Sequence, residues 1–456
     1  MRGGFQTLTC VFLLILSMSH GSARAETPAL RVGLAKAKVT PEEPIRMAGY
    51  AGREEPSDGV LSDLYVKAMA VEYAGARPVL LVTADLINFR AETWQEICRR
   101  IGERTGLKPE EILLVPSHTH AGPVFGPEVR TYGLAGEELA VVERYTEKLY
   151  AQVADLAAEA LETRQPAKLS SGIGKAGFVM NRREQTKQGI RIGVNPEGFV
   201  DRSVPVLRVD DGDGQLRALV FGCACHNTTL GGKNFKISSE YAGFAQEALE
   251  RQFPGVQAMF MIGCAGDANP DPRGTVELAQ EHGRSLAKEV AHVAAGPLRP
   301  IAGPLRIAFG WADLPLAPMP SPEELREMAK GPSYLVPNAK RMLTMREKSE
   351  ELPTHYRAPL SVWQFGNDLT LLALPGEVVS GYVPLMQKAL GEEGLWIAGY
   401  ANESFGYLPT RQVLAEGGYE TRGLIFDTGF FGSEVEDAVV ATARKLCKEA
   451  GRQGMP

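Results

Sequence analysis

Short apolar runs alternate with longer amphipathic stretches along almost all of this 456-residue chain, and no feature constrains the fold more. Apolar runs of about four to eight residues are typical of buried strands, whereas apolar residues spaced three and four apart are typical of helices. We predict strands over residues 30–39, 64–72, 78–87, 112–116, 204–209, 216–224, 256–262, 305–311, 361–374 and 395–400. We predict helices over residues 91–104, 137–163, 240–252, 276–295, 322–329, 339–351, 384–390 and 434–450. This interleaving, without an internal repeat, predicts an α/β protein with helices flanking mixed β-sheets.

The chain is expected to form one large domain over residues 26–456, because no low-complexity linker divides it. With 44% hydrophobic residues, it has enough apolar material for a large core. Residues 317–357 are rich in proline and charge. We expect this segment to be an inserted helical pair that could lie over a pocket.

The first 25 residues have the pattern of a secretory signal peptide. Arg2 precedes the apolar run 11–18, and Ala23-Arg24-Ala25 is a typical cleavage site. We therefore expect a secreted or periplasmic protein. No later window reaches the roughly 18 apolar residues that a membrane-spanning helix needs, so we expect no transmembrane segment in the mature chain.

The charge and the cysteines exclude two further classes. A net charge of −6, without a cluster of lysine and arginine, gives no reason to expect nucleic acid as a partner. The mature chain keeps an odd, sparse set of cysteines, which argues against a disulfide framework. They are Cys98, Cys223, Cys225, Cys264 and Cys447.

Two histidines follow one of the predicted strands. The apolar residues 112–115 lead into Ser117-His118-Thr119-His120, and then into Gly122-Pro123. If the strand continued, His118 and His120 would point to the same face, about 6 to 7 Å apart. Two neutral imidazole nitrogens aimed at one spot suit a metal ion. Taken alone, the pair is equally consistent with two structural histidines.

Polar residues also follow several other predicted strands. The junctions are Cys225-His226-Asn227, Gly266-Asp267-Ala268-Asn269, Pro375-Gly376-Glu377, and Gly399-Tyr400-Ala401-Asn402 leading to Gly406-Tyr407. Loops at one edge of an α/β sheet share a crevice, so these groups are expected to converge. Three histidines and a carboxylate are enough to hold zinc with one position open for water.

Each of these residues also has a structural interpretation. A lone His226 is more typical of a hydrogen-bonded core histidine. Glu377 could be an acid at a helix N-terminus, and Asp267 could bind backbone amides in a turn.

Eight short motifs occur in a fixed order along the chain. They are Val32-Gly-Leu-Ala-Lys-Ala-Lys-Val-Thr-Pro41, Met47-Ala-Gly-Tyr50, Ser117-His-Thr-His-Ala-Gly-Pro123, Asn181-Arg182, His226 with Ile237-Ser-Ser-Glu240, Gly266-Asp-Ala-Asn-Pro270, Leu374-Pro-Gly-Glu377 and Gly418-Tyr-Glu420. Together they resemble the catalytic domain of neutral (non-lysosomal) ceramidases. The similarity spans nearly the whole mature chain.

The resemblance implies a zinc site and a surrounding set of catalytic residues. The implied zinc ligands are His118, His226, Glu377 and Tyr407. The residues implied around the reacting amide are His120, Arg182 and Tyr419. Asn269 is expected to contact the substrate. Asp85 and Asp267 are expected to support the ligands from behind. For Asp85 the alternative is an acid that caps the strand-to-helix loop.

The chemistry of these residues agrees with the resemblance. Two neutral histidines and one carboxylate leave zinc with a formal charge of about +1, enough to bring the pKa of water from about 15.7 toward about 7. Because an ionised Tyr407 would cancel that charge, we expect a neutral phenol. His120 is then free to act as general base or acid, and Arg182 and Tyr419 to bind the carbonyl oxygen.

The sequence departs from the family in two respects. The family carries a serine where this chain has Asn269, and asparagine is not a useful nucleophile. The chemistry would therefore depend on a water molecule. The family's C-terminal immunoglobulin-like domain has no counterpart here, so we expect the catalytic domain without it.

We therefore expect a secreted zinc-dependent amidohydrolase that cleaves an N-acyl, lipid-like substrate. Sphingolipids are among the candidate substrates. An esterase, lactonase or phosphoesterase on the same scaffold is an alternative. A phosphoesterase would need two metals about 3.5 to 4 Å apart, and its ligands would come from Asp85, His118, His120, His226 and Asp267. A further alternative is a non-catalytic binding protein, against which the complete ligand set argues.

Overall fold

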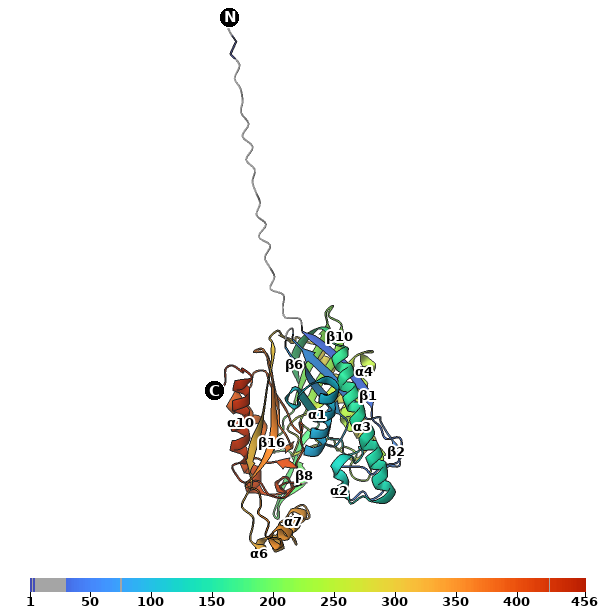
Figure 1. Ribbon diagram of the computed structural model, residues 1–456, viewed down its shortest axis with the longest axis vertical. Helices are drawn as coiled ribbons and strands as arrows, with labels where there is room; N and C mark the ends of the chain where they lie inside the picture. Colours follow the sequence, from blue (N-terminus) through green and yellow to red (C-terminus); the bar gives the residue numbers. More distant parts are fainter. Residues whose placement is uncertain (2, 5–29, 74–75, 426) are drawn as a thin grey trace.

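The computed structural model describes residues 30–73, 76–425 and 427–456, together with residues 1, 3 and 4. The predicted signal peptide therefore lies almost entirely outside the described residues. The predicted α/β architecture is confirmed: helices flank two larger sheets, and three small sheets lie around them (Figure 1).

The main sheet has nine strands. Its order is β12-β10-β9-β6-β1-β3-β4-β5, with β14 paired to β6. The strands are β1 (Arg31–Lys38), β3 (Tyr65–Glu72), β4 (Val79–Ala84), β5 (Ile112–Pro116), β6 (Gln165–Lys175), β9 (Ser203–Asp211), β10 (Leu216–Cys223), β12 (Gln257–Ile262) and β14 (Arg299–Ile301). The pairs β4–β5 and β10–β12 are parallel, so both strands of each pair end at the same edge. The segments that follow β5 and β10 carry the predicted histidines.

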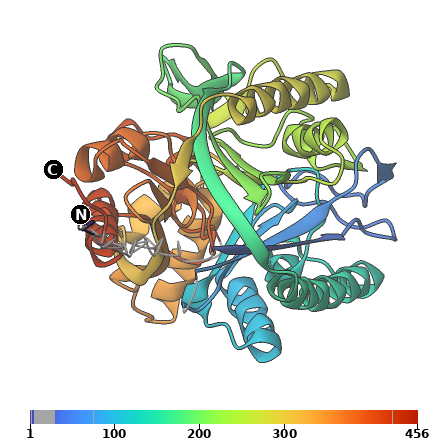
Figure 2. The ribbon, with the colours of Figure 1, turned by 90° about the horizontal axis from the view of Figure 1, so that it is seen from above.

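Both faces of this sheet are buried, as the continuous apolar strands require. Along β4, Leu81 belongs to one hydrophobic cluster, while Leu80 and Val82 belong to another. In the view of Figure 2, α4 (Glu240–Gln252) and α5 (Val276–Ala295) lie on one side, and α1 (Ala91–Thr105) and α3 (Gly136–Glu162) on the other.

The second larger sheet has the order β15-β16-β17-β19. Its strands are β15 (Leu305–Pro315), β16 (His355–Phe365), β17 (Leu369–Ala373) and β19 (Leu395–Ala398), and α8 (Tyr382–Leu390) and α10 (Val435–Glu449) share its hydrophobic cluster. The single strand predicted over 361–374 is wrong: it is the end of β16 and all of β17, joined by a turn at Gly366 with φ of +51°. Glycine tolerates that left-handed conformation, which reverses the chain.

Three small sheets complete the architecture. One consists of β13 (Ala268–Pro270), β7 (Val179–Thr186) and β8 (Gly189–Asn195), another of β18 (Glu377–Val378) and β20 (Tyr407–Leu408), and the last of β2 (Gly59–Val60) and β11 (Lys236–Ile237). Short helical turns are α2 (Val129–Tyr132), α9 (Arg411–Glu416), η1 (Pro109–Glu111), η2 (Gly126–Glu128) and η3 (Tyr419–Thr421). None of the strands β6, β7 and β8 was among the predicted elements.

The predicted insertion is a helical pair, α6 (Pro322–Met328) and α7 (Val336–Glu347). In the view of Figure 1 the pair lies at the lower end of the molecule, at the opposite end from β10. Within the described ranges, no helix has both the length and the apolar character needed to cross a membrane. The five described cysteines are free and buried.

Candidate metal centre

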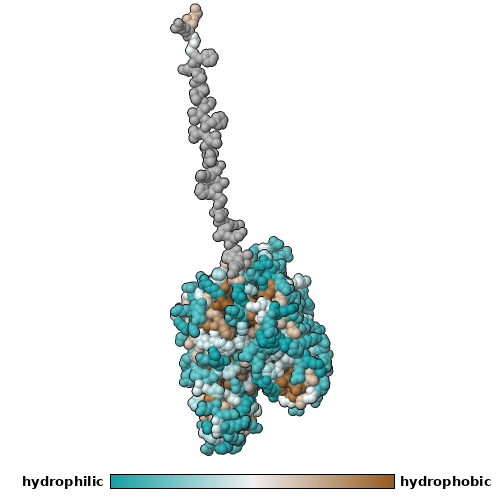
Figure 3. Space-filling model, viewed as in Figure 1, coloured by the Kyte–Doolittle hydropathy of each residue, from teal (hydrophilic) through white to brown (hydrophobic). Residues whose placement is uncertain are grey.

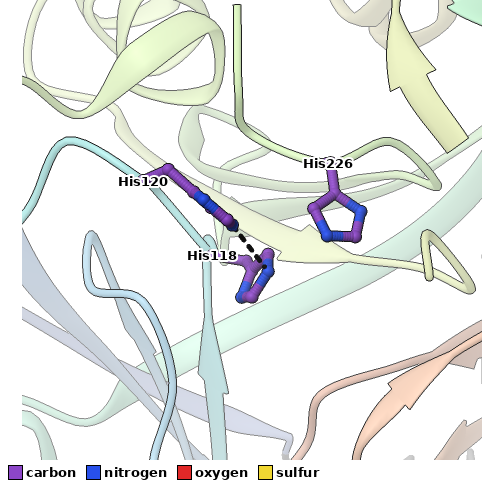
Figure 4. A group of neighbouring side chains, drawn as sticks. All are labelled: His118, His120 and His226. Carbon is purple, nitrogen blue, oxygen red and sulfur yellow. Dashed lines mark hydrogen bonds between the residues drawn. The ribbon is translucent and has the colours of Figure 1, made fainter. Parts of the chain in front are cut away.

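Three histidines converge beyond the ends of β5 and β10. His120 Nε2 lies 3.1 Å from His118 Nε2, and one ring nitrogen from each of His118, His120 and His226 lies within 4.8 Å of the others. Figure 4 shows the three rings facing one another. A bridge between Thr119 and Asn227, with His120 N–H donating to Asn227 O at 3.1 Å, holds the two segments together. These side chains could hold a metal ion.

The predicted route to this convergence is wrong. β5 ends at Pro116, and His118 has a left-handed φ of +58°, so the two histidines do not lie on one face of a strand. Their rings stand at 79° with centroids 4.8 Å apart. The left-handed turn at His118, and not the alternation of a strand, therefore sets how the two rings meet.

His118 and His226 differ from His120 in the hydrogen bonds of their Nδ1 atoms. His118 Nδ1–H donates to Ile87 O at 2.6 Å, and His226 Nδ1–H donates to Ala265 O at 2.7 Å. Because a carbonyl only accepts, each Nε2 keeps its lone pair, which is the arrangement that metal ligands need. His120 Nδ1 is buried without a partner, and His120 supplies the proton of its bond to His118 Nε2. Its tautomer is therefore not fixed by the backbone.

Glu377 brings a carboxylate to the same atoms. Its Oε2 lies 3.2 Å from His226 Nε2 and 3.5 Å from His118 Nε2, and this buried oxygen has no hydrogen-bond partner. Burial opposes ionisation, but the neighbouring His118 and His226 hold the pKa of Glu377 well below its usual range. An ionised oxygen without a hydrogen-bond partner, beside two ring nitrogens, is a set of atoms that fits a metal ion.

Two of the three rings, those of His120 and His226, are held neutral. Burial lowers the pKa of His226 to about 3, with a further contribution from Arg182. Burial, and then the neighbouring His118 and His226, also lower the pKa of His120 well below its usual value. Neutral imidazoles are the form that binds a metal.

The separations fit a tetrahedral site. Zinc–nitrogen and zinc–oxygen bonds of about 2.0 to 2.2 Å place neighbouring ligand atoms roughly 3.3 to 3.6 Å apart. The distances from Glu377 Oε2 to the two Nε2 atoms, 3.2 and 3.5 Å, agree with this. A donor set of imidazole nitrogen and carboxylate oxygen suits zinc and several other first-row transition metals.

Tyr407 joins the site through the pairing of β20 with β18, where it lies opposite Glu377. Its hydroxyl accepts a hydrogen bond from Arg182 Nη2 at 2.9 Å. Burial raises the pKa of Tyr407 well above its ordinary value, so the phenol is neutral. The neutral phenol agrees with the expectation from the sequence.

Arg182 is more constrained than expected. Its Nε donates to Glu420 at 2.9 Å, and its Nη1 donates to His226 Nε2 at 3.2 Å. Together with the bond to Tyr407, these contacts commit all three nitrogens of the guanidinium. Its planar group also lies 5.4 Å from the Tyr407 ring and 5.8 Å from the Tyr419 ring.

Tyr419 begins η3 and lies beside Tyr407, with ring centroids 5.5 Å apart. Its hydroxyl oxygen accepts from Arg422 Nη1 at 2.6 Å, which leaves the hydroxyl proton free to donate.

The two acids expected behind the ligands differ in position. Asp267 accepts from the backbone N–H of Ser380 at 2.6 Å and from its hydroxyl at 3.0 Å, and so supports the segment that carries Glu377. Asp85 accepts from Tyr65 N–H and from Gln246. These partners are not metal ligands, and the Ile87 carbonyl occupies the position behind His118 instead. The geometry favours the structural alternative for Asp85.

Asn269 lies on β13, and its Oδ1 accepts from the Thr228 hydroxyl at 3.3 Å. It is buried next to the His226 segment.

Two glycines of the recognised motifs make room for the site. A Cβ on Gly49, which has φ of +93°, would lie 2.6 Å from the His120 ring, and one on Gly266 would lie 2.6 Å from Glu377 O. The backbone therefore approaches His120 and Glu377 so closely that both positions require glycine.

Two neighbours were not assigned a role from the sequence. Tyr400, fully buried with a φ of +58°, has its ring 4.5 Å from that of His118 and its hydroxyl 3.4 Å from His226 Nδ1. Glu420 binds both Arg182 and Arg183. The local signal for Tyr400 was its position just after a strand, which it shares with the predicted ligands. Glu420 ends one of the eight motifs, but no role was assigned to it.

The fold and the site together define a class of protein. It is an α/β protein with a buried cluster of histidines and a carboxylate that could hold a metal. The family described as neutral/alkaline non-lysosomal ceramidase, N-terminal, matches residues 30–287, more than half of the chain. The chain belongs to this family. The match includes His118, His120, Arg182 and His226, whereas Glu377, Tyr407 and Tyr419 lie beyond it.

Individual relatives agree. The chain is 28% identical over 280 residues to a neutral ceramidase from Pseudomonas aeruginosa and 21% identical over 280 residues to neutral ceramidase A from Dictyostelium discoideum. These matches cover 58% and 57% of this chain, but only 40% and 38% of the relatives. The chain therefore matches about two fifths of their length.

The fold is also that of solved ceramidases. The crystal structure of the Pseudomonas aeruginosa neutral ceramidase superposes with a TM-score of 0.71 at 20% identity, covering 94% of this chain and 76% of that chain. A ceramidase complexed with C2 gives a TM-score of 0.69 at 19% identity, covering 94% and 77%.

Proposed function

We propose that this protein is a zinc-dependent hydrolase that cleaves the amide bond of an N-acyl, ceramide-like lipid. The observation that carries the proposal is the division among the histidines: two have Nδ1 fixed on backbone carbonyls and Nε2 aimed at an orphaned carboxylate oxygen, and the third does not. Family membership supports the reaction class.

His118, His226 and Glu377 would hold the zinc, with the neutral Tyr407 hydroxyl beside them. A bound zinc ion would supply Lewis acidity and lower the pKa of a water molecule at the open position. Asp267 supports this arrangement by holding Ser380, three residues beyond Glu377.

His120 is the residue available for proton transfer. It lies against the ligand cluster, 3.1 Å from His118 Nε2, but its Nδ1 is not fixed by any partner. It would take a proton from the attacking water and deliver it to the departing amine, the two steps that an amide hydrolase needs from a general base and acid.

Tyr419 is the better placed donor for the carbonyl oxygen. Its oxygen already accepts from Arg422, so its own proton is free. Arg182 was expected to share this role, but its contacts with Glu420, Tyr407 and His226 favour a different one: it orients the two tyrosines. The developing negative charge would still lie near a buried cation.

Asn269 offers no nucleophile, and we propose that it contacts substrate through its amide. Attack by water then predicts that a single turnover in ¹⁸O-labelled water puts the label into the released acid, without an acyl-enzyme detectable by mass spectrometry.

A two-metal phosphoesterase is less well supported. It would draw ligands from Asp85 and Asp267, whose oxygens accept hydrogen bonds from Tyr65 and Gln246 and from Ser380. We also propose that residues 1–25 direct secretion, as expected from their sequence.

The test is to express the mature chain with zinc, measure metal by elemental analysis, and assay N-acyl amides, a matched ester and a phosphate ester. We expect about one zinc per chain and cleavage of the amides, lost on chelation and restored by zinc. A metal-free protein that cleaves none of these compounds would contradict the proposal and leave the binding-protein alternative.

A further inference from the structure

Three tyrosine rings form a row that leads outward from the ligand cluster. Tyr407 and Tyr419 have centroids 5.5 Å apart at 72°, and Tyr419 and Tyr334 have centroids 5.6 Å apart at 70°. Tyr407 is buried at 4% exposure, whereas Tyr419 and Tyr334 are half-buried. The row therefore begins at the metal centre, where Arg182 touches both Tyr407 and His226, and ends at a more exposed ring.

Tyr334 lies in the turn between the two helices of the insertion, two residues before α7 begins at Val336. None of the hydrogen bonds in the described part of the chain uses its hydroxyl, so the ring is placed by packing alone. Figure 3, seen as in Figure 1, shows the surface notched between the part that carries α6 and α7 and the part that carries α2. The pair stands on one side of this notch.

α7 is fixed to the loop that carries Tyr419. The buried Asn338 donates to Gly429 O at 2.6 Å and accepts from Gly429 N–H at 3.0 Å. Arg341 Nη2 donates to Leu424 O at 3.0 Å and to Asp427 O at 2.7 Å. A Cβ on Gly423 would lie 2.7 Å from Asn338 Nδ2. α7 and the described part of the segment that follows Tyr419 are thus held together.

We propose that Tyr334 is a specificity-determining residue whose ring contacts the acyl chain of the substrate, and that Asn338 is a positioning residue for the Tyr419 loop. The inference rests on the proposed function. If Tyr419 donates to the carbonyl oxygen, Tyr334 is the next ring outward in the row and would meet the carbons beyond that carbonyl. A short acyl group would not reach Tyr334, and a long one would pack against it.

The test compares an N-acetyl and an N-dodecanoyl amide of the same amine. Tyr334→Ala should raise KM for the N-dodecanoyl amide roughly tenfold, as expected when about two methylene groups lose their contact, with kcat and the N-acetyl kinetics nearly unchanged. Tyr334→Phe should behave as wild type. Asn338→Ala should lower kcat for both amides, because it loosens the loop that carries Tyr419. Lys330→Ala, exposed in the same insertion, is the matched control.

Equal losses on both amides in Tyr334→Ala, or no loss on either, would overturn the assignment. A Tyr334→Phe variant as poor as Tyr334→Ala would do the same, because the hydroxyl would then matter. Calorimetric titration of the zinc-depleted proteins with both amides measures the contact without hydrolysis. If wild type binds the N-dodecanoyl amide more tightly than Tyr334→Ala does but hydrolyses neither amide, the inference stands and the proposed function fails.

Discussion

The metal centre is built by two regions that use different means. At the sheet edges, backbone carbonyls of Ile87 and Ala265 fix His118 and His226. In the segment beyond β19, side-chain contacts do this instead: Arg422 binds Tyr419, and Glu420 binds Arg182 of β7. Backbone contacts persist as long as the sheet is folded, whereas side-chain contacts depend on each partner. The difference suggests a rigid ligand region and an adjustable catalytic region.

The largest effect should come from the rigid region. His118→Ala removes a fixed ligand nitrogen, so zinc and activity should be lost together, with turnover falling by at least about 10³-fold. Elemental analysis and an amide assay on the same sample measure both. His355→Ala, which changes an exposed histidine, should leave both intact. A His118→Ala variant that kept its zinc would break the distinction between the regions.

His120→Ala should separate metal binding from turnover. Because His120 Nδ1 is not fixed by the backbone, the variant should retain most of its zinc while turnover falls about 10² to 10⁴-fold. Metal content and kcat of the purified variant are the measurements. Zinc loss equal to that of His118→Ala would mean that His120 is a third nitrogen ligand.

Glu420→Gln tests the adjustable region. Glu420 is 1% exposed and binds Arg182 and Arg183, so weakening this buried cluster should lower the free energy of unfolding by about 2 to 4 kcal/mol. Turnover should fall about tenfold to hundredfold with zinc retained, because Arg182 no longer orients the tyrosines. The control is Glu416→Gln, which changes a more exposed partner of Arg183 and should cost less than about 1 kcal/mol. Zinc loss in Glu420→Gln would show that the two regions are not separable.

Asp85 should affect stability alone. Burial raises its pKa to about 6, above the value of about 3.9 for an unfolded chain. Between these values the folded state binds more protons than the unfolded state, so the free energy of unfolding should fall as pH rises, by about 3 kcal/mol in all. Denaturant titrations at pH values from about 3.5 to about 7 cover the range between the two pKa values. They should show that the free energy of unfolding depends less on pH in Asp85→Asn than in wild type. The exposed Asp58→Asn should keep it. A loss of zinc or of turnover in Asp85→Asn at neutral pH would place Asp85 in the site after all.

Local patterns predicted the parts of the fold that bury apolar side chains. β5, α4 and α5 match their predicted bounds, because their apolar periodicity is unbroken. β7 could not be found in this way: its buried residues include Asn181, Arg182 and Arg183, which are buried through polar partners from distant segments.

In the candidate site, too, local patterns predicted some features, and contacts between distant segments could not be predicted. His118, His120, His226 and Glu377 lie just beyond strands or in short ones, and their convergence could be predicted because loops at one sheet edge meet. The left-handed turn at His118 could not be predicted, since residues other than glycine are uncommon in that conformation. Glu420 was missed because its role depends on two arginines more than two hundred residues earlier in the chain.

The most direct test of the account is zinc X-ray absorption spectroscopy on the loaded wild-type protein and on His120→Ala. The account predicts two imidazole nitrogens at about 2.0 to 2.1 Å, with oxygen completing the shell, and the same two imidazoles after His120→Ala. Three imidazoles in wild type, falling to two in the variant, would contradict it.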